Sequence, residues 1–166
     1  IIITKIPFPQ VTMKEDKEIL SKLNIPSEKN GDLSPEEERK LSEHIKEKEN
    51  HEFVFITEYP IEERPFYHMR LETDKNLTKS FDLLWNGLEI TTGAQREHRY
   101  DILASQAKEK KLGLDPIQFY LNFFKYGCPP HGGFGLGPTR MLMKIFNIEN
   151  VREVTFLYRG VKRLSP

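Results

Sequence analysis

Cysteine is nearly missing from this sequence, occurring once, at Cys128. A single cysteine excludes an intrachain disulfide and is typical of a reducing compartment, so we expect a cytoplasmic protein. No apolar run approaches the ~18 residues that a membrane-spanning helix requires. The opening Ile1–Ile3 is also too short for the core of a signal peptide. The sequence therefore predicts no association with a membrane.

The sequence also lacks an excess of charge of either sign. Its 25 basic and 25 acidic side chains cancel, which argues against a broad electrostatic surface for nucleic acid. With 37% hydrophobic residues in 166 positions, the chain is long enough to bury a core. We therefore predict a single domain over residues 1–166.

Capping motifs predict where helices begin. Thr12 and Glu15 form a capping box, in which each side chain satisfies a free backbone amide, and predict a helix to about Leu23. Ser34 as N-cap and Pro35 at the first helical position predict a second helix. Further helices are expected over residues 99–112, 115–127 and 139–146.

The predicted strands are mainly antiparallel neighbours. The apolar run 53–56 suits a central strand, and residues 1–6 and 66–71 are also predicted strands. The clearest hairpin spans 80–92 around Asn86-Gly87, a dipeptide that favours a tight type I′ turn. Residues 151–158 are expected to form a last strand or helix edge. Antiparallel strands with flanking helices predict an α+β fold.

The hairpin carries two acidic residues, Asp82 and Glu89. A two-residue turn at Asn86-Gly87 would pair Asp82 with Thr91, so both carboxylates would lie on one face, on a diagonal roughly 5.5–8 Å long at the backbone. Two such carboxylates suit Mg²⁺, which prefers one or two of them plus phosphate oxygens. The alternative is that this face is simply the solvated side of the sheet.

Two further segments have the composition of an anion-binding site. The run 91–96 is small, rich in hydroxyls and ends at Arg96, and a guanidinium binds a carboxylate through two hydrogen bonds. The glycine-rich run 132–137 lets a ligand approach the backbone, and Arg140 follows in the first turn of a helix, where anions are favoured. Taken alone, a surface arginine and an ordinary glycine-rich turn explain these segments equally well.

In combination, these motifs resemble the catalytic core of class II aminoacyl-tRNA synthetases, and specifically the archaeal-type aspartyl enzyme. The resemblance rests on Phe66-Tyr67, the runs 80–84, 87–96 and 129–137, Arg140 and the run 162–166. It covers nearly the whole chain, from just after motif 2 through motif 3 to the C-terminus. It implies a partial class II fold, an antiparallel sheet flanked by helices, in a family of homodimers. Because motifs 1 and 2 are not in this sequence, the chain is not expected to work alone.

The resemblance implies a role for each matching residue. Asp82 and Glu89 would hold Mg²⁺. The ATP-binding residues would be Glu89, Gly135, Gly137 and Arg140. Aspartate would be bound by Tyr67, Thr92, Gln95 and Arg96. Catalysis would rest on Arg96, Arg140 and Glu89, through positioning and charge neutralisation without a protein nucleophile.

Two departures from the synthetase pattern lead to our main functional interpretation. Thr139 replaces the acidic residue before the motif 3 arginine, and the run 158–161 replaces a charged run near the end. A small hydroxyl residue before that arginine is similar to ammonia-dependent asparagine synthetase, a relative that uses no tRNA. The chain is therefore interpreted as an archaeal asparagine-synthetase-related paralogue. ATP and aspartate would give an aspartyl-adenylate, which ammonia would convert to asparagine and AMP after release of pyrophosphate.

Two alternatives to this interpretation stay open. The first is the catalytic domain of an aspartyl- or asparaginyl-tRNA synthetase, with tRNA as a partner that we do not favour. The second is an inactive paralogue that binds aspartate or an adenylate. The presence together of Asp82, Glu89, Arg96 and Arg140 argues against an inactive protein.

Overall fold

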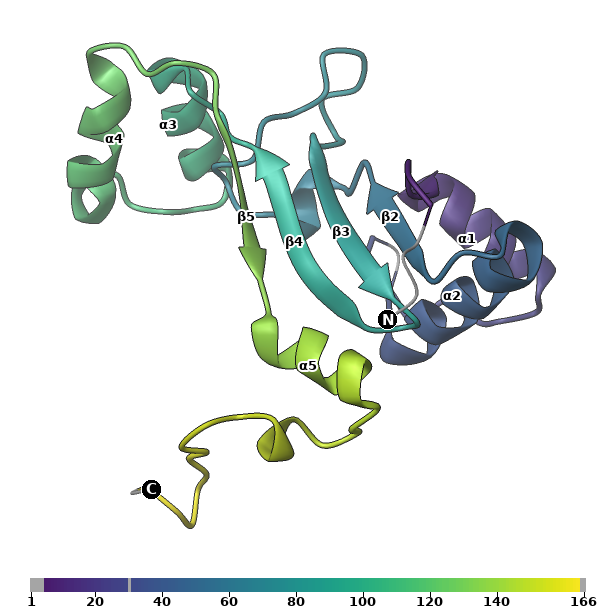
Figure 1. The fold of residues 1–166 in the computed structure, drawn as a ribbon. Helices are drawn as coiled ribbons and strands as arrows, with labels where there is room; N and C mark the ends of the chain where they lie inside the picture. The colour runs from purple at the N-terminus through teal and green to yellow at the C-terminus, as the bar shows by residue number, and fades with distance from the viewer. Residues whose placement is uncertain (1–4, 30, 165–166) are drawn as a thin grey trace.

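A five-stranded sheet forms the centre of the protein, seen here in a computed structural model that describes residues 5–29 and 31–164 (Figure 1). The strands lie side by side in chain order. They are β1 (Gln10–Thr12), β2 (Phe53–Thr57), β3 (Ser80–Trp85), β4 (Glu89–Gln95) and β5 (Gly132–Leu136). β1 is parallel to β2, and the other neighbours are antiparallel. The predicted α+β fold with a mainly antiparallel sheet is confirmed.

Helices gather at the two ends of the sheet, with α1 and α2 near β2 and with α3 and α4 together beyond the end of β4 (Figure 1). The α-helices are α1 (Met13–Lys22), α2 (Pro35–Glu49), α3 (Tyr100–Glu109), α4 (Gln118–Lys125) and α5 (Pro138–Phe146). Short 3-10 helices are η1 (Ile61–Glu63), η2 (Asp115–Ile117) and η3 (Val151–Glu153). No helix in the described ranges is both long and apolar enough to cross a membrane.

Both predicted capping motifs are present. The Glu15 amide donates to the Thr12 hydroxyl at 3.2 Å, and the Thr12 amide donates to the Glu15 carboxylate at 2.8 Å. Ser34 and Glu37 repeat this arrangement at the start of α2. The apolar faces of the two helices then cover β2 and β3, which buries one core cluster. Its members include Leu20, Leu41, Ile45, Val54, Ile56 and Leu84.

The β3–β4 hairpin turns at Asn86-Gly87 as predicted. Both residues have positive φ, 45° and 74°, which a type I′ turn requires. The predicted pairing of Asp82 with Thr91 is wrong, because an irregularity between Leu83 and Leu84 shifts the register by one residue. Asp82 is paired with Thr92 instead. The bulge leaves Ile90 unpaired opposite β3.

Three predicted strands need correction. Residues 1–4 lie outside the described residues, and Lys5 and Ile6 are not in a strand. The segment 66–71 makes only single bridges. The Met69 amide donates to the Gln95 carbonyl of β4, and the Met69 carbonyl accepts from the Lys79 amide. Only η3 forms within 151–158. The helix predicted over 99–112 ends earlier, at Glu109, and Lys111 has a positive φ of 59°.

Candidate active site

One face of the sheet carries a row of the predicted site residues. Asp82 on β3 is directly opposite Thr92 on β4, and Thr92 is opposite Gly135 on β5. Direct cross-strand partners present their side chains to the same face. Glu89 is paired with Leu84, two residues along from Asp82, and so belongs to this face as well. The two predicted metal-binding acids therefore share one face of the sheet.

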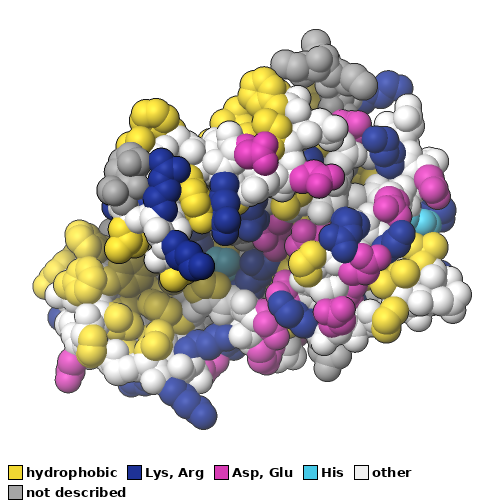
Figure 2. Space-filling model, turned by 90° about the horizontal axis from the view of Figure 1, so that it is seen from below, with side chains coloured by type: hydrophobic (Ala, Val, Ile, Leu, Met, Phe, Trp, Pro, Cys, Tyr) yellow, Lys and Arg dark blue, Asp and Glu magenta, His cyan; other side chains and the backbone are white. Residues whose placement is uncertain are grey.

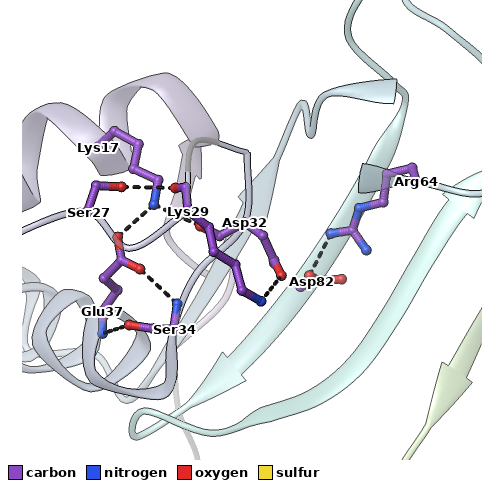
Figure 3. A network of polar contacts seen from close by, with 8 residues as sticks. All are labelled: Lys17, Ser27, Lys29, Asp32, Ser34, Glu37, Arg64 and Asp82. Carbon is purple, nitrogen blue, oxygen red and sulfur yellow. Dashed lines mark hydrogen bonds and ion pairs between the residues drawn. The ribbon is translucent and has the colours of Figure 1, made fainter. Parts of the chain in front are cut away.

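Arg64, from the loop after η1, reaches Asp82 from the side (Figure 3). Its Nη2 donates to Asp82 Oδ2 at 2.6 Å, and its Nη1 donates to the Thr92 hydroxyl at 3.3 Å. The guanidinium carbon lies 3.5 Å from the ring centroid of Tyr59. Asp82 Oδ1 is buried and has no hydrogen-bond partner among residues 5–29 and 31–164. One carboxylate oxygen is thus held by Arg64, and the other lies buried close to the Tyr59 side chain.

Acidic side chains from three elements repel one another on this face. Burial, and then repulsion from Asp82, raises the pKa of Glu89. Burial, and then repulsion from Glu89, raises the pKa of Glu38 on α2 to about 7. Arg140 counters this repulsion, since its Nη1 donates to the Glu89 carbonyl at 2.7 Å and to Glu89 Oε1 at 3.2 Å. A divalent cation would relieve the same repulsion, so these acids fit Mg²⁺.

A second guanidinium group, that of Arg96, lies near the Arg64–Asp82 pair. The Arg96 guanidinium carbon lies 5.0 Å from the ring centroid of Tyr67, and Arg96 Nη2 donates to the Gly133 carbonyl at 3.2 Å. Burial, and then the charges of Arg96 and Arg64, lowers the pKa of His68 to about 4. Two guanidinium groups close enough to act on one imidazole create a local positive potential. That potential favours a carboxylate.

The structure does not bring all of the predicted residues together. Side chains alternate along β4, so Gln95, which is paired with Gly132, faces away from Thr92. Gly137 lies at the start of α5, where its amide donates to the Ile90 carbonyl at 2.8 Å. Gly137 therefore fixes where α5, and with it Arg140, leaves the sheet.

Sequence reasoning missed Arg64, Glu38 and His68. Arg64 directly precedes the Pro65–Tyr67 run, but nothing in its spacing from Asp82 indicates an ion pair. Glu38 lies in a charged stretch that is otherwise the solvated face of α2, and only the packing of α2 against the hairpin brings it to Glu89. These contacts join residues that are far apart in the sequence, so local sequence patterns do not predict them.

Comparison with known proteins decides the family. The profile for "tRNA synthetases class II (D, K and N)" matches residues 2–159. The chain belongs to this family. It is 46% identical over 162 residues to the aspartate–tRNA(Asp) ligase of Pyrococcus furiosus, covering 98% of this chain and 37% of that protein. It is 49% identical over 160 residues to the aspartate–tRNA(Asp/Asn) ligase of Methanopyrus kandleri, covering 96% of this chain and 36% of that protein.

Solved class II synthetases share the fold. The aspartyl-tRNA synthetase of Entamoeba histolytica superposes with a TM-score of 0.93 at 35% identity, covering 99% of this chain and 34% of that one. The asparaginyl-tRNA synthetase of Pyrococcus horikoshii, complexed with asparaginyl-adenylate, gives a TM-score of 0.88 at 29% identity, covering 98% and 37% of the two chains. This synthetase chain therefore spans little more than a third of the length of the relatives it matches.

The interpretation as an ammonia-dependent asparagine synthetase is wrong. The similar proteins are tRNA ligases over almost the entire chain. That interpretation relied on Thr139 and on the short run 158–161, and two local departures do not outweigh agreement over 162 residues. The alternative interpretation, a domain of an aspartyl- or asparaginyl-tRNA ligase, agrees with these relatives.

Proposed function

We propose that this class II synthetase chain binds ATP, Mg²⁺ and aspartate, as part of an aspartate–tRNA ligase. One observation carries the proposal: the acids Asp82 and Glu89 share a sheet face with Thr92, beside the Arg64 and Arg96 guanidinium groups. Identity to aspartate–tRNA ligases supports the choice of substrates. Assembly as a homodimer and a cytoplasmic location stay predictions.

The ATP side of the proposed site is built around Glu89. Asp82 and Glu89 would bind Mg²⁺, which supplies neutralisation of the phosphate charge when bound. No cluster of three or more metal-ligating side chains occurs in the part of the chain that the structure describes. Arg140 would contact the phosphates from the first turn of α5, and Gly135 would leave room for the nucleotide on the sheet.

The aspartate side of the proposed site is built around Arg96. Its guanidinium would bind one substrate carboxylate through two hydrogen bonds, with Tyr67 and Thr92 beside it. Arg64 adds a second guanidinium close by, which favours an acidic amino acid over its uncharged amide. The proposal leaves Gln95 out, because its side chain faces the other side of the sheet.

The proposed reaction has two steps. A carboxylate oxygen of aspartate attacks the α-phosphorus of ATP, pyrophosphate leaves, and an aspartyl-adenylate forms. A hydroxyl of tRNA then attacks the acyl carbon and releases AMP. This chain would act by holding the reacting groups in line and stabilising charge, and it supplies no nucleophile.

The test is aspartate-dependent exchange of labelled pyrophosphate into ATP, followed by formation of aspartyl-tRNA, with the complete protein that contains this chain. We expect exchange with aspartate and not with asparagine, and we expect Arg96→Ala to abolish it. The matched control is Arg39→Ala, since Arg39 is exposed and pairs with Glu36 outside the proposed site. Exchange with asparagine alone, or no transfer to tRNA, would refute the proposal.

A further inference from the structure

A cavity lies along α3, between that helix and the segment 70–75. Its volume is about 300 Å³, at the low end of the roughly 300–1,000 Å³ that ligand pockets occupy. None of its lining residues belongs to the proposed ATP or aspartate sites. Ile102 is the one apolar residue among them, but apolar atoms of the charged and polar residues supply most of the surface that faces the cavity. A cavity of this size and lining suits a small ligand that has both charged and apolar parts.

The charges on the wall balance, and one of each sign is left without a partner. Ion pairs join Arg70 to Glu109 and Arg99 to Glu97. The remaining charged side chains on the wall are Lys75 and Asp101. Both are exposed to solvent, and neither makes an ion pair or side-chain hydrogen bond with another described residue. A ligand that carries both a negative and a positive group would satisfy these two side chains together.

Gln106 supplies an independent sign that the cavity is built for a ligand. Its side chain lines the cavity and is 2% exposed, yet its Oε1 accepts no hydrogen bond from the rest of the described chain. A buried acceptor without a donor is costly, and native proteins rarely keep one. The Gln106 Nε2 donates to the carbonyls of Phe66 and His68, which flank Tyr67. A ligand bound in the cavity would therefore affect the position of Tyr67, whose ring lies beneath the Arg96 guanidinium.

We propose that this cavity is a second ligand site that takes a small zwitterion, a free α-amino acid. The ligand carboxylate pairs with Lys75, and its ammonium group pairs with Asp101 and donates to Gln106 Oε1. A zwitterion fits better than a simple anion or cation, because the unpaired charges on the wall sum to zero. The site is separate from the one proposed for the aspartate substrate.

Binding of L-alanine to the complete protein carrying Arg96→Ala tests this site, since that change removes binding at the proposed aspartate site. Propionate and ethylamine, which keep one charge each, are the matched ligands, and calorimetry is the measurement. We expect L-alanine to bind and each single-charge analogue to bind at least about tenfold more weakly. Lys75→Ala and Asp101→Asn should each weaken L-alanine binding about tenfold, and Lys108→Ala, an exposed change on α3, should leave it unchanged.

Three results would overturn the inference. The first is no binding of L-alanine in the Arg96→Ala background. The second is binding of propionate or ethylamine as tight as that of L-alanine, which would show that the site does not recognise both charges of the ligand together. The third is binding that Lys75→Ala and Asp101→Asn do not weaken. Pyrophosphate exchange by the unaltered protein is measured separately, so failure here is distinguishable from failure of the proposed ligase function.

Discussion

Arg64 and Asp82 form an ion pair of 2.6 Å whose side chains are only 12% and 7% exposed. The pair fastens the loop after η1 to the middle of β3 (Figure 3). The Lys29–Asp32 ion pair lies next to it, and Arg64 lowers the pKa of Asp32 as one of several contributors after Lys29 and the local backbone. On the face shown in Figure 2, acidic and basic side chains are likewise mixed rather than segregated. The charge of Arg64 is thus balanced locally by Asp82.

Removal of Arg64 should destabilise the fold strongly. Arg64→Ala leaves Asp82 buried without its partner, and breaking a buried pair costs about 3 kcal/mol. Urea unfolding measures the change. Arg39→Ala is the matched control, because its ion pair with Glu36 is about half exposed on both sides and should contribute less than about 1 kcal/mol. Equal losses of unfolding free energy in the two variants would contradict the prediction that the buried Arg64–Asp82 pair contributes more than an exposed one.

His68 should make the protein less stable as the pH falls. Its pKa in the fold, about 4, is lower than its ordinary value of 6.5 because of burial and then the charges of Arg96 and Arg64. Below pH 6.5 the unfolded chain therefore binds a proton at His68, whereas the folded chain binds that proton only near pH 4. Stability should drop across that window by up to about 3 kcal/mol. His68→Gln should flatten this part of the pH profile, and an unchanged slope would contradict the assignment.

The sequence predicted those features of the fold that depend on neighbouring residues. The capping boxes at Thr12 and Ser34 and the Asn86-Gly87 turn all formed, because each is decided by contacts within a few residues. The prediction that Asp82 and Glu89 share one face holds because Glu89 is paired with Leu84, two residues from Asp82 on β3, despite the bulge at Ile90. The same bulge shifts the partner of Asp82 from Thr91 to Thr92. The sequence could not predict this shift, because one extra residue in a strand leaves no mark on composition.

The rest of the site depends on contacts over long separations in sequence. Arg64 meets Asp82 across 18 positions, and Glu38 reaches Glu89 only through the packing of α2 on the hairpin. The segment 66–71 has the composition of a strand, yet its backbone partners alternate between β4 and Lys79, so no continuous ladder forms. Local propensity cannot choose between such competing partners.

Asp16 should have the opposite pH dependence from His68. Burial, with repulsion from Glu37, raises its pKa to about 7 although Lys17 opposes the shift. The folded chain then holds a proton that the unfolded chain has lost above its ordinary value of 3.8, so stability falls as the pH rises from about 4 to about 7. Asp16→Asn should remove this slope and stabilise the protein at pH 8 by at most about 4 kcal/mol.

Glu18→Gln is the control for this change, because Glu18 lies on the same helix and is exposed. Its effect should stay within about 0.5 kcal/mol at both ends of the range. Unfolding in urea at pH 4.5 and pH 8 provides the comparison. Equal destabilisation of the Asp16→Asn variant at both pH values would show that Asp16 is charged in the fold.

Two glycines on adjacent strands should separate folding from nucleotide binding. A Cβ added at Gly135 meets no atom within 4 Å, on the face that carries Asp82 and Thr92. Gly135→Val should therefore leave stability within about 0.5 kcal/mol while it fills the proposed ATP space and weakens ATP binding by about tenfold. A Cβ at Gly93, on the opposite face, would lie 2.5 Å from the Phe81 ring. Gly93→Ala should cost about 1–3 kcal/mol through overpacking, with ATP affinity unchanged in the molecules that remain folded. ATP binding that survives Gly135→Val would remove β5 from the nucleotide site.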